Sequence, residues 1–228
     1  MAIKLVVFDI AGTTVKDDRE VSKAFQAALK KYNYQVELDS IDPLMGYEKP
    51  LAIRQMLQLH ETNTDKITDE LVQDIHQEFV RQMISFYQNE PGLEPLPHVE
   101  ETFAALHAAG IQVGINTGFS RDIADTIINR LQWREKGLID HLVGSDEVAF
   151  GRPYPYMIQK MMLEGDITDP LQVAKVGDTE VDVREGQNAG CKYAIAVTTG
   201  AFTRAQLEPY NPTHIIDDIA QIIDIINQ

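Results

Sequence analysis

Four short polar segments of the chain carry residues that could act on a phosphoryl group. They read DIAGTT at 9–14, NTGFS at 116–120, GRPYP at 151–155 and KVGDT at 175–179, with Asp182 three residues beyond the last. A single Asp after an apolar run is often only a turn residue or a helix cap. Four such features in this order favour one shared site.

The residue types in these segments suit metal-assisted chemistry at phosphorus. Asp9 and Asp178 offer carboxylates with no basic residue beside them, which is the donor type that Mg²⁺ prefers. Thr117, the backbone N–H of Gly118 and the planar fork of Arg152 suit phosphoryl oxygens. A carboxylate beside Mg²⁺ can attack phosphorus and form an aspartyl-phosphate.

Short apolar runs and helical patterns alternate along most of the chain, which predicts an α/β fold with a doubly wound, mainly parallel sheet. The expected strands are 4–9, 111–117, 141–145, 173–178, 193–199 and 213–217. The expected helices between them are 99–109, 121–131, 154–163, 180–189 and 218–226. Ligands bind at the carboxyl ends of the strands in such sheets, where the polar segments fall.

One stretch interrupts the alternation directly after the first strand. Residues 16–89 contain no convincing strand, and amphipathic helices are expected at 19–32, 51–60 and 68–87. A Pro- and Gly-rich linker follows at 89–97. We therefore expect an α/β core of residues 1–15 and 90–228, with a helical cap domain of residues 16–89 inserted into it.

Composition excludes several classes of protein. The 228 residues include 20 basic and 35 acidic side chains, a net charge of −15, which argues against nucleic-acid binding and anionic membranes. No apolar stretch approaches the ~18 residues of a membrane span, and the first residues lack a signal-peptide pattern. One cysteine, Cys191, fits a reducing compartment, so a cytoplasmic protein is expected.

Other catalytic motifs are missing from the sequence. The six histidines show no zinc-ligand spacing. A G-x-S-x-G elbow, a phosphate-binding P-loop and a dinucleotide fingerprint are also absent.

The motifs resemble the haloacid dehalogenase superfamily, and most closely its phosphonatase branch. Superfamily members usually carry a second Asp two positions after the first, whereas the phosphonatase branch has alanine there, as Ala11 is here. That branch also has an arginine in place of the usual lysine, within the same GRPYP pentapeptide that holds Arg152. In the insert, MGYEK at 45–49 is similar to the branch's segment that carries a Schiff-base lysine.

This resemblance implies a Rossmann-like core and a role for each matching residue. Asp9 is the expected nucleophile, and Lys49 is expected to form an imine with a substrate aldehyde. The expected Mg²⁺ ligands are Asp9, the backbone carbonyl of Ala11 and Asp178, with Asp182 as an indirect ligand. The expected substrate-binding residues are Gly12, Thr13, Thr117, Gly118 and Arg152. The resemblance also implies a small phosphonate or phosphorylated molecule as the substrate, and it favours a homodimer.

The imine gives a chemical reason for Ala11. An ester phosphatase needs an acid there to protonate a leaving alkoxide, but C–P cleavage expels a carbanion and needs an electron sink instead. Lys49 precedes Pro50 at the start of the expected helix 51–60. A helix N-terminus lowers the pKa of an amine and adjacent Glu48 raises it, so the net direction is open.

Two departures from the branch keep other functions open. Ala52 stands where the branch has a histidine, and Phe119 stands where it has a tyrosine. The alternatives are a phosphatase, or a phosphoryl mutase, that acts on a small phosphate ester, and a non-catalytic module that binds a phosphorylated ligand. The absence of an acid at position 11 counts against the first, and the intact set of Asp9, Asp178 and Arg152 counts against the second.

Overall fold

A six-stranded parallel sheet forms the centre of the molecule in the computed structural model, which describes residues 2–227. The strands are β1 (Leu5–Phe8), β2 (Gln112–Asn116), β3 (His141–Val143), β4 (Val173–Gly177), β5 (Tyr193–Val197) and β6 (His214–Ile216). Their order is β3-β2-β1-β4-β5-β6, and every neighbouring pair is parallel. The predicted α/β class is confirmed, and all the expected strands are present.

The register of the central strands aligns the polar segments. Phe8, the last residue of β1, lies opposite Ile115 of β2 and Val176 of β4. The backbone N–H of Asp9 then donates to the carbonyl of Val176 at 3.0 Å. Because β2 and β4 flank β1, the residues after all three strands emerge at the same edge of the sheet.

Helices cover both faces of the sheet, as a doubly wound fold requires. The larger core helices are α5 (Val99–Ala108), α6 (Arg121–Leu131), α7 (Tyr156–Glu164), α8 (Glu180–Asn188) and α10 (Ile222–Ile226). Val6 and Phe8 pack with α5, α6 and α10, whereas Leu5 and Val7 pack with α7 on the opposite face. The four residues of β1 are fully buried, which accounts for their unbroken apolar run.

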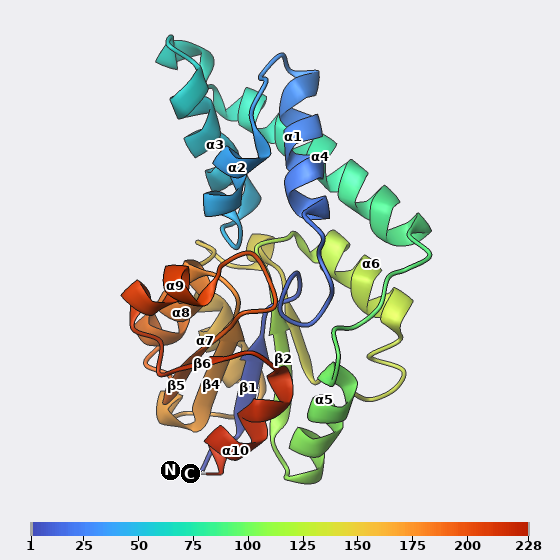
Figure 1. The fold of residues 1–228 in the computed structure, drawn as a ribbon, viewed down its shortest axis with the longest axis vertical. Helices are drawn as coiled ribbons and strands as arrows, with labels where there is room; N and C mark the ends of the chain where they lie inside the picture. The colour runs from blue at the N-terminus through green and yellow to red at the C-terminus, as the bar shows by residue number, and fades with distance from the viewer. Residues whose placement is uncertain (1, 228) are drawn as a thin grey trace.

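The inserted segment forms a helical cap beyond the carboxyl ends of the strands (Figure 1). Its helices are α1 (Glu20–Lys31), α2 (Leu38–Ile41), α3 (Lys49–His60) and α4 (Asp69–Asn89). The long helix α4 is capped by Thr68, the residue before its first turn, whose side chain accepts from the N–H of Leu71 at 3.1 Å. Phe79 of α4 meets Phe25 of α1 edge to face, with ring centroids 6.0 Å apart. We propose residues 16–89 as the boundaries of this cap.

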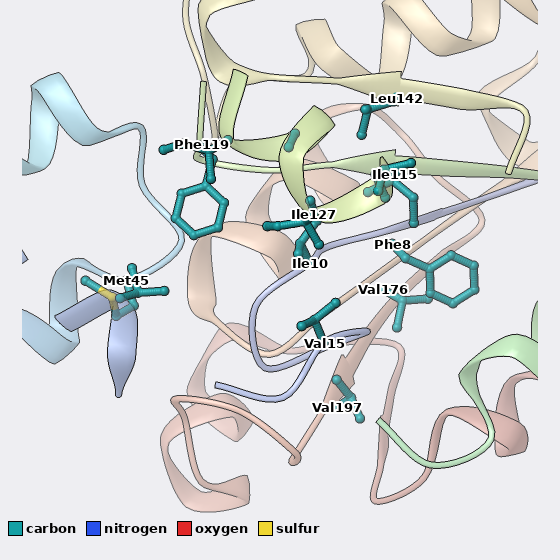
Figure 2. Close-up of a cluster of buried hydrophobic side chains, with 14 of the residues drawn as sticks. Phe8, Ile10, Val15, Met45, Ile115, Phe119, Ile127, Leu142, Val176 and Val197 are labelled. Atoms are coloured by element: carbon teal, nitrogen blue, oxygen red, sulfur yellow. The ribbon is translucent and has the colours of Figure 1, made fainter. Parts of the chain in front are cut away.

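The apolar core continues from the sheet toward the cap. Phe119, just after β2, belongs to the same buried cluster as Phe8 and Ile115 of the strands and Met45 of the cap. Figure 2 shows Phe119 and Met45 at the end of this cluster that is farthest from Phe8. The cap therefore rests on the end of the core that carries the polar segments.

The sequence missed the smallest elements. Helices α2 and α9 (Arg204–Leu207) have four residues each. That is too short for the hydrophobic periodicity of a helix to be recognised in the sequence. Short 3₁₀ turns occupy Asp42–Leu44, Thr64–Lys66, Ser145–Glu147, Pro170–Gln172, Glu208–Tyr210 and Ile219–Gln221. Two of these turns shorten expected elements, because β3 ends at Val143 and α10 begins only at Ile222. None of the helices in residues 2–227 has the length and apolar character that a bilayer span needs.

Candidate active site

Three carboxylates meet at the carboxyl edge of the sheet: Asp9 after β1, Asp178 after β4, and Asp182 in the first turn of α8. Asp9, Asp178 and Asp182 each offer an oxygen, and these oxygens lie within 4.8 Å of one another in a buried position. Asp178 accepts from the hydroxyl of Thr13 at 3.0 Å and from the N–H of Ala201 at 2.7 Å. Burial, then Asp9, then Asp182 raise the pKa of Asp178 to about 8. Carboxylates crowded in this way fit a hard cation.

Gly12 gives this acidic group its closest approach to the backbone. Its φ of +82° lies in the left-handed region, and a Cβ there would come within 2.7 Å of Asp178 Oδ2 and 2.8 Å of the Gly200 Cα. Only glycine meets both requirements. The turn after β1 is therefore shaped around Asp178.

Arg152 joins the carboxylates from the loop before α7. Its guanidinium is 1% exposed, donates to Asp9 Oδ1 at 2.7 Å, and makes a second ion pair with Asp182 Oδ1. Burial lowers the pKa of Arg152, but Asp182 and Asp9 outweigh that effect and raise it, so the guanidinium stays charged. Its Nε is buried and, within residues 2–227, has no hydrogen-bond partner. Arg152 thus keeps one donor spare beside the candidate nucleophile.

Asp182 forms ion pairs with two buried cations of the site, Arg152 and Lys175. Its Oδ1 contacts both Arg152 and Lys175, the latter at 3.0 Å, and its Oδ2 accepts from the N–H and hydroxyl of Thr179. Burial raises its pKa, but Arg152 and Lys175 overcome that effect and lower the pKa to about 2. Both carboxylate oxygens of Asp182 are therefore engaged by neighbouring groups.

Lys175 is a further residue of the site, and the motifs along the chain assign it no role. It is fully buried on β4 and donates to Asn116 Oδ1 at 2.8 Å, while Glu185 lies 3.5 Å from its Nζ. Asn116 in turn donates to both oxygens of Glu185, at 2.8 and 3.0 Å. A lysine inside the apolar run of a central strand was the available signal, because a buried lysine requires a partner.

Gly118 is one of the points at which the cap touches the core. A Cβ at this position would lie 2.5 Å from the carbonyl oxygen of Tyr47 and 2.7 Å from that of Gly46. The neighbouring Thr117 is buried, and its hydroxyl accepts from the N–H of Phe119 at 3.2 Å. The loop of the cap that precedes Lys49 therefore lies directly over the end of β2.

Lys49 is the first residue of α3, and its side chain is buried under the cap. Its Nζ donates to the carbonyl of Tyr47 at 3.1 Å and lies 5.5 Å from the ring centre of Phe119 and 5.9 Å from that of Phe79. Burial and then Arg152 lower the pKa of Lys49 to about 8, against the opposing effect of Asp9.

The neighbouring Glu48 does not hold Lys49 in its charged form. Its Oε2 accepts from the backbone N–H of Gly151 at 2.9 Å, across the boundary between cap and core. The direction that the sequence left open is thus decided by burial, which lowers the pKa of Lys49.

One cavity of about 300 Å³ brings most of the predicted residues together. Its lining includes Asp9, Ala11, Gly12, Lys49, Thr117, Gly118, Arg152 and Asp178. Thr13 and Asp182 do not line it; Thr13 contacts Asp178, and Asp182 contacts Arg152. Ala52 is fully buried in α3 and does not line the cavity, so the histidine that the phosphonatase branch has at this position has no direct replacement here.

The fold and the site together define a capped α/β enzyme of the hydrolase class. The Haloacid dehalogenase-like hydrolase family matches residues 6–196. The chain belongs to this family.

Relatives of similar sequence are phosphonoacetaldehyde hydrolases. The chain is 33% identical over 208 residues to the bifunctional phosphonoacetaldehyde hydrolase/aminoethylphosphonate transaminase of Clostridioides difficile strain 630, covering 87% of this chain and 32% of that longer protein. It is 30% identical over 216 residues to the phosphonoacetaldehyde hydrolase of Bacillus cereus strain G9842, covering 88% of this chain and 78% of the relative.

Solved structures share the fold. A phosphonoacetaldehyde hydrolase-like protein from Oleispira antarctica superposes with a TM-score of 0.83 at 23% identity, covering 100% of this chain and 92% of that one. A predicted phosphoglycolate phosphatase from Haemophilus somnus 129PT gives a TM-score of 0.80 at 21% identity, covering 99% and 98% of the two chains. The capped architecture is therefore common to proteins described with different substrates.

Proposed function

We propose that this hydrolase is a Mg²⁺-dependent, phosphonatase-like enzyme that cleaves the C–P bond of phosphonoacetaldehyde or a closely related small phosphonate. The observation that carries the proposal is the position of Lys49. It is a buried lysine with a pKa lowered to about 8, and it lines the same cavity as Asp9. An amine of this kind forms imines with aldehydes. Hydrolysis of a phosphate ester does not require such an amine.

The core side of the cavity would bind and transfer the phosphoryl group. Asp9 attacks phosphorus and forms the aspartyl-phosphate, while Arg152, Thr117 and the N–H of Gly118 hold the phosphoryl oxygens. Water then hydrolyses the aspartyl-phosphate, which releases inorganic phosphate and restores the Asp9 carboxylate. Gly12 lines the same cavity, and its lack of a Cβ lets Asp178 approach the turn after β1. Thr13 keeps Asp178 in place through its hydroxyl.

The acidic group fits Mg²⁺, which Asp9, the backbone carbonyl of Ala11 and Asp178 would hold, with Asp182 acting indirectly through Arg152. When bound, Mg²⁺ neutralises charge between the attacking carboxylate and the phosphoryl oxygens.

The cap side would activate the carbon. The Lys49 amine attacks the substrate aldehyde and water leaves. The resulting imine takes up a proton from solvent and then accepts the electron pair of the breaking C–P bond. The organic product remains on Lys49 as an enamine until it takes a proton and is hydrolysed. A methyl group at Ala11 fits this route, since no alkoxide leaves and no acid is needed there.

A phosphatase acting on a small phosphate ester is the second candidate. Phe119 and Ala52 differ from the phosphonatase branch close to Lys49. The same fold also occurs in a protein described as a predicted phosphoglycolate phosphatase. A non-catalytic module that binds a phosphorylated ligand is a third reading, and the convergence of Asp9, Arg152 and Asp178 disfavours it.

Phosphate release separates these candidates. The purified enzyme is assayed with phosphonoacetaldehyde and with phosphoglycolate, each with and without Mg²⁺. We expect Mg²⁺-dependent release from the phosphonate at least ~10²-fold faster than from the ester. Faster phosphate release from the ester would support the phosphatase candidate. No release from either compound would favour the non-catalytic binding module.

The remaining features of the proposal come from the sequence alone. The single cysteine fits a cytoplasmic enzyme, and the resemblance to the phosphonatase branch favours a homodimer. Sedimentation equilibrium of the purified protein tests the second point, with a monomer mass as the contradicting result.

A further inference from the structure

The proposed reaction needs a proton that none of its assigned residues supplies. When the C–P bond breaks, the carbon that held phosphorus becomes the end of an enamine and must be protonated before the product can leave. Asp9 then carries the phosphoryl group, and Arg152 stays charged because its pKa is raised. Ala11 has no proton to give. The donor must be another group that lines the cavity.

The cap contributes two carboxylates to the cavity, Asp17 and Asp42. Asp42 is fully engaged, because its Oδ1 accepts from the hydroxyl of Ser22 at 2.9 Å and its Oδ2 pairs with Arg19 at 2.7 Å. Both oxygens of Asp42 are therefore occupied by other side chains, which leaves neither of them to face a substrate.

Asp17 is in a different position, on the connection between the core and α1. Its Oδ1 accepts a hydrogen bond from the backbone N–H of Val21 at 3.2 Å, and no side chain of residues 2–227 donates to it. Burial raises its pKa, and the charge of Glu20 adds to that rise. The opposing effects come from backbone N–H groups and from Lys49, and Tyr87 of α4 is a further titratable group influenced by Asp17. Asp17 thus combines a place in the cavity with one oxygen free of side-chain partners.

We propose that Asp17 is the acid that protonates the enamine carbon on Lys49. This inference rests on the proposed C–P hydrolase function. The Asp17 carboxyl gives its proton to the carbon released from phosphorus, which converts the enamine into the iminium of the dephosphorylated aldehyde and leaves Asp17 ionised. Water then adds to the iminium carbon and Asp17 takes up the proton that is released. The aldehyde departs, and the neutral amine of Lys49 and the protonated carboxyl of Asp17 are both restored.

Asp17→Asn tests this role, because asparagine keeps the acceptor for the N–H of Val21 but cannot donate a carboxyl proton. Rapid acid quench measures phosphate formed from phosphonoacetaldehyde in the presence of Mg²⁺, during the first turnover and in the steady state. The matched control is Asp18→Asn, since Asp18 is an exposed neighbour whose ion pair is with Lys16.

The expected result is a burst. The variant breaks the C–P bond at close to the parent rate once, giving about one phosphate per active site, and then turns over ~10²-fold more slowly, within the usual range for loss of a general acid. The parent enzyme and Asp18→Asn give no such burst.

Three outcomes oppose the expectation, and they have different meanings. Steady turnover of Asp17→Asn within about twofold of the parent would overturn the role of Asp17. Equal slowing of the first and later turnovers would also overturn it, because Asp17 would then act before C–P cleavage or only on the fold. An absence of phosphate from the parent enzyme would instead overturn the proposed function.

Discussion

The lowered pKa of Lys49 makes a quantitative prediction about imine formation. Only the neutral amine attacks an aldehyde. With a pKa of about 8, about a quarter of Lys49 is neutral at pH ~7.5, whereas an ordinary lysine with a pKa of 10.5 would be about a thousandth neutral. The buried site therefore gains roughly 200-fold in reactive amine at this pH. The gain comes from burial first and from the charge of Arg152 second.

The perturbation is Lys49→Arg, which keeps a positive charge but cannot form the imine because a guanidinium stays protonated. We expect phosphate release from phosphonoacetaldehyde to fall by at least ~10³-fold, while binding of inorganic phosphate in the presence of Mg²⁺ persists. Lys66→Arg is the matched control, because Lys66 also lies in the cap but is 64% exposed and is 3.7 Å from Glu61.

Two measurements on the parent enzyme check the reasoning. Borohydride added with phosphonoacetaldehyde should leave an adduct that mass spectrometry locates on Lys49. The rate of adduct formation should rise with pH and level off above a pH of about 8, since the neutral amine accumulates through that range. A rate that keeps rising to pH ~10, or an Arg variant that releases phosphate at the parent rate, would refute the argument.

Four further predictions concern the core. Asp9→Asn should reduce phosphate release by ~10⁴-fold, roughly 5 kcal/mol, with an unchanged circular dichroism spectrum; more than a tenth of the parent activity would remove Asp9 from the nucleophile role. In metal-free protein, Asp178→Asn should raise the melting temperature, because ionising Asp178 beside two other acids disfavours the folded state above pH ~4, and Mg²⁺ should then no longer raise it further. Asp182→Asn should lower the melting temperature more than the other three substitutions in this paragraph do, since it leaves the buried cations Arg152 and Lys175 without their shared partner. A melting temperature equal to that of the parent would contradict this. Gly118→Ala should raise KM by about tenfold, because its Cβ would press on the carbonyl of Tyr47 and hold the cap away from the core; an unchanged KM would show that the loop yields.

The order of the polar segments already determined which residues would meet. Parallel strands end at a common edge, so Asp9 and Asp178 after β1 and β4, and Thr117 after β2, are brought together by topology alone. The helical insert after β1 was visible as a change of period from strand to helix. Its cavity-facing lysine, Lys49, came from the resemblance of MGYEK at 45–49 to a known family and not from periodicity.

The tertiary structure decided everything that depends on contacts between distant segments. The sequence left the direction of the pKa shift of Lys49 open, and it was settled by the burial of that side chain between Phe79 and Phe119, which are 40 residues apart in the chain. The shared pairing of Asp182 with Arg152 and Lys175 was likewise unreadable from spacing. Patterns along a chain report which residues lie on one strand or helix face, whereas dielectric environment and ion-pair choice depend on which faces pack together, and only the folded chain sets that.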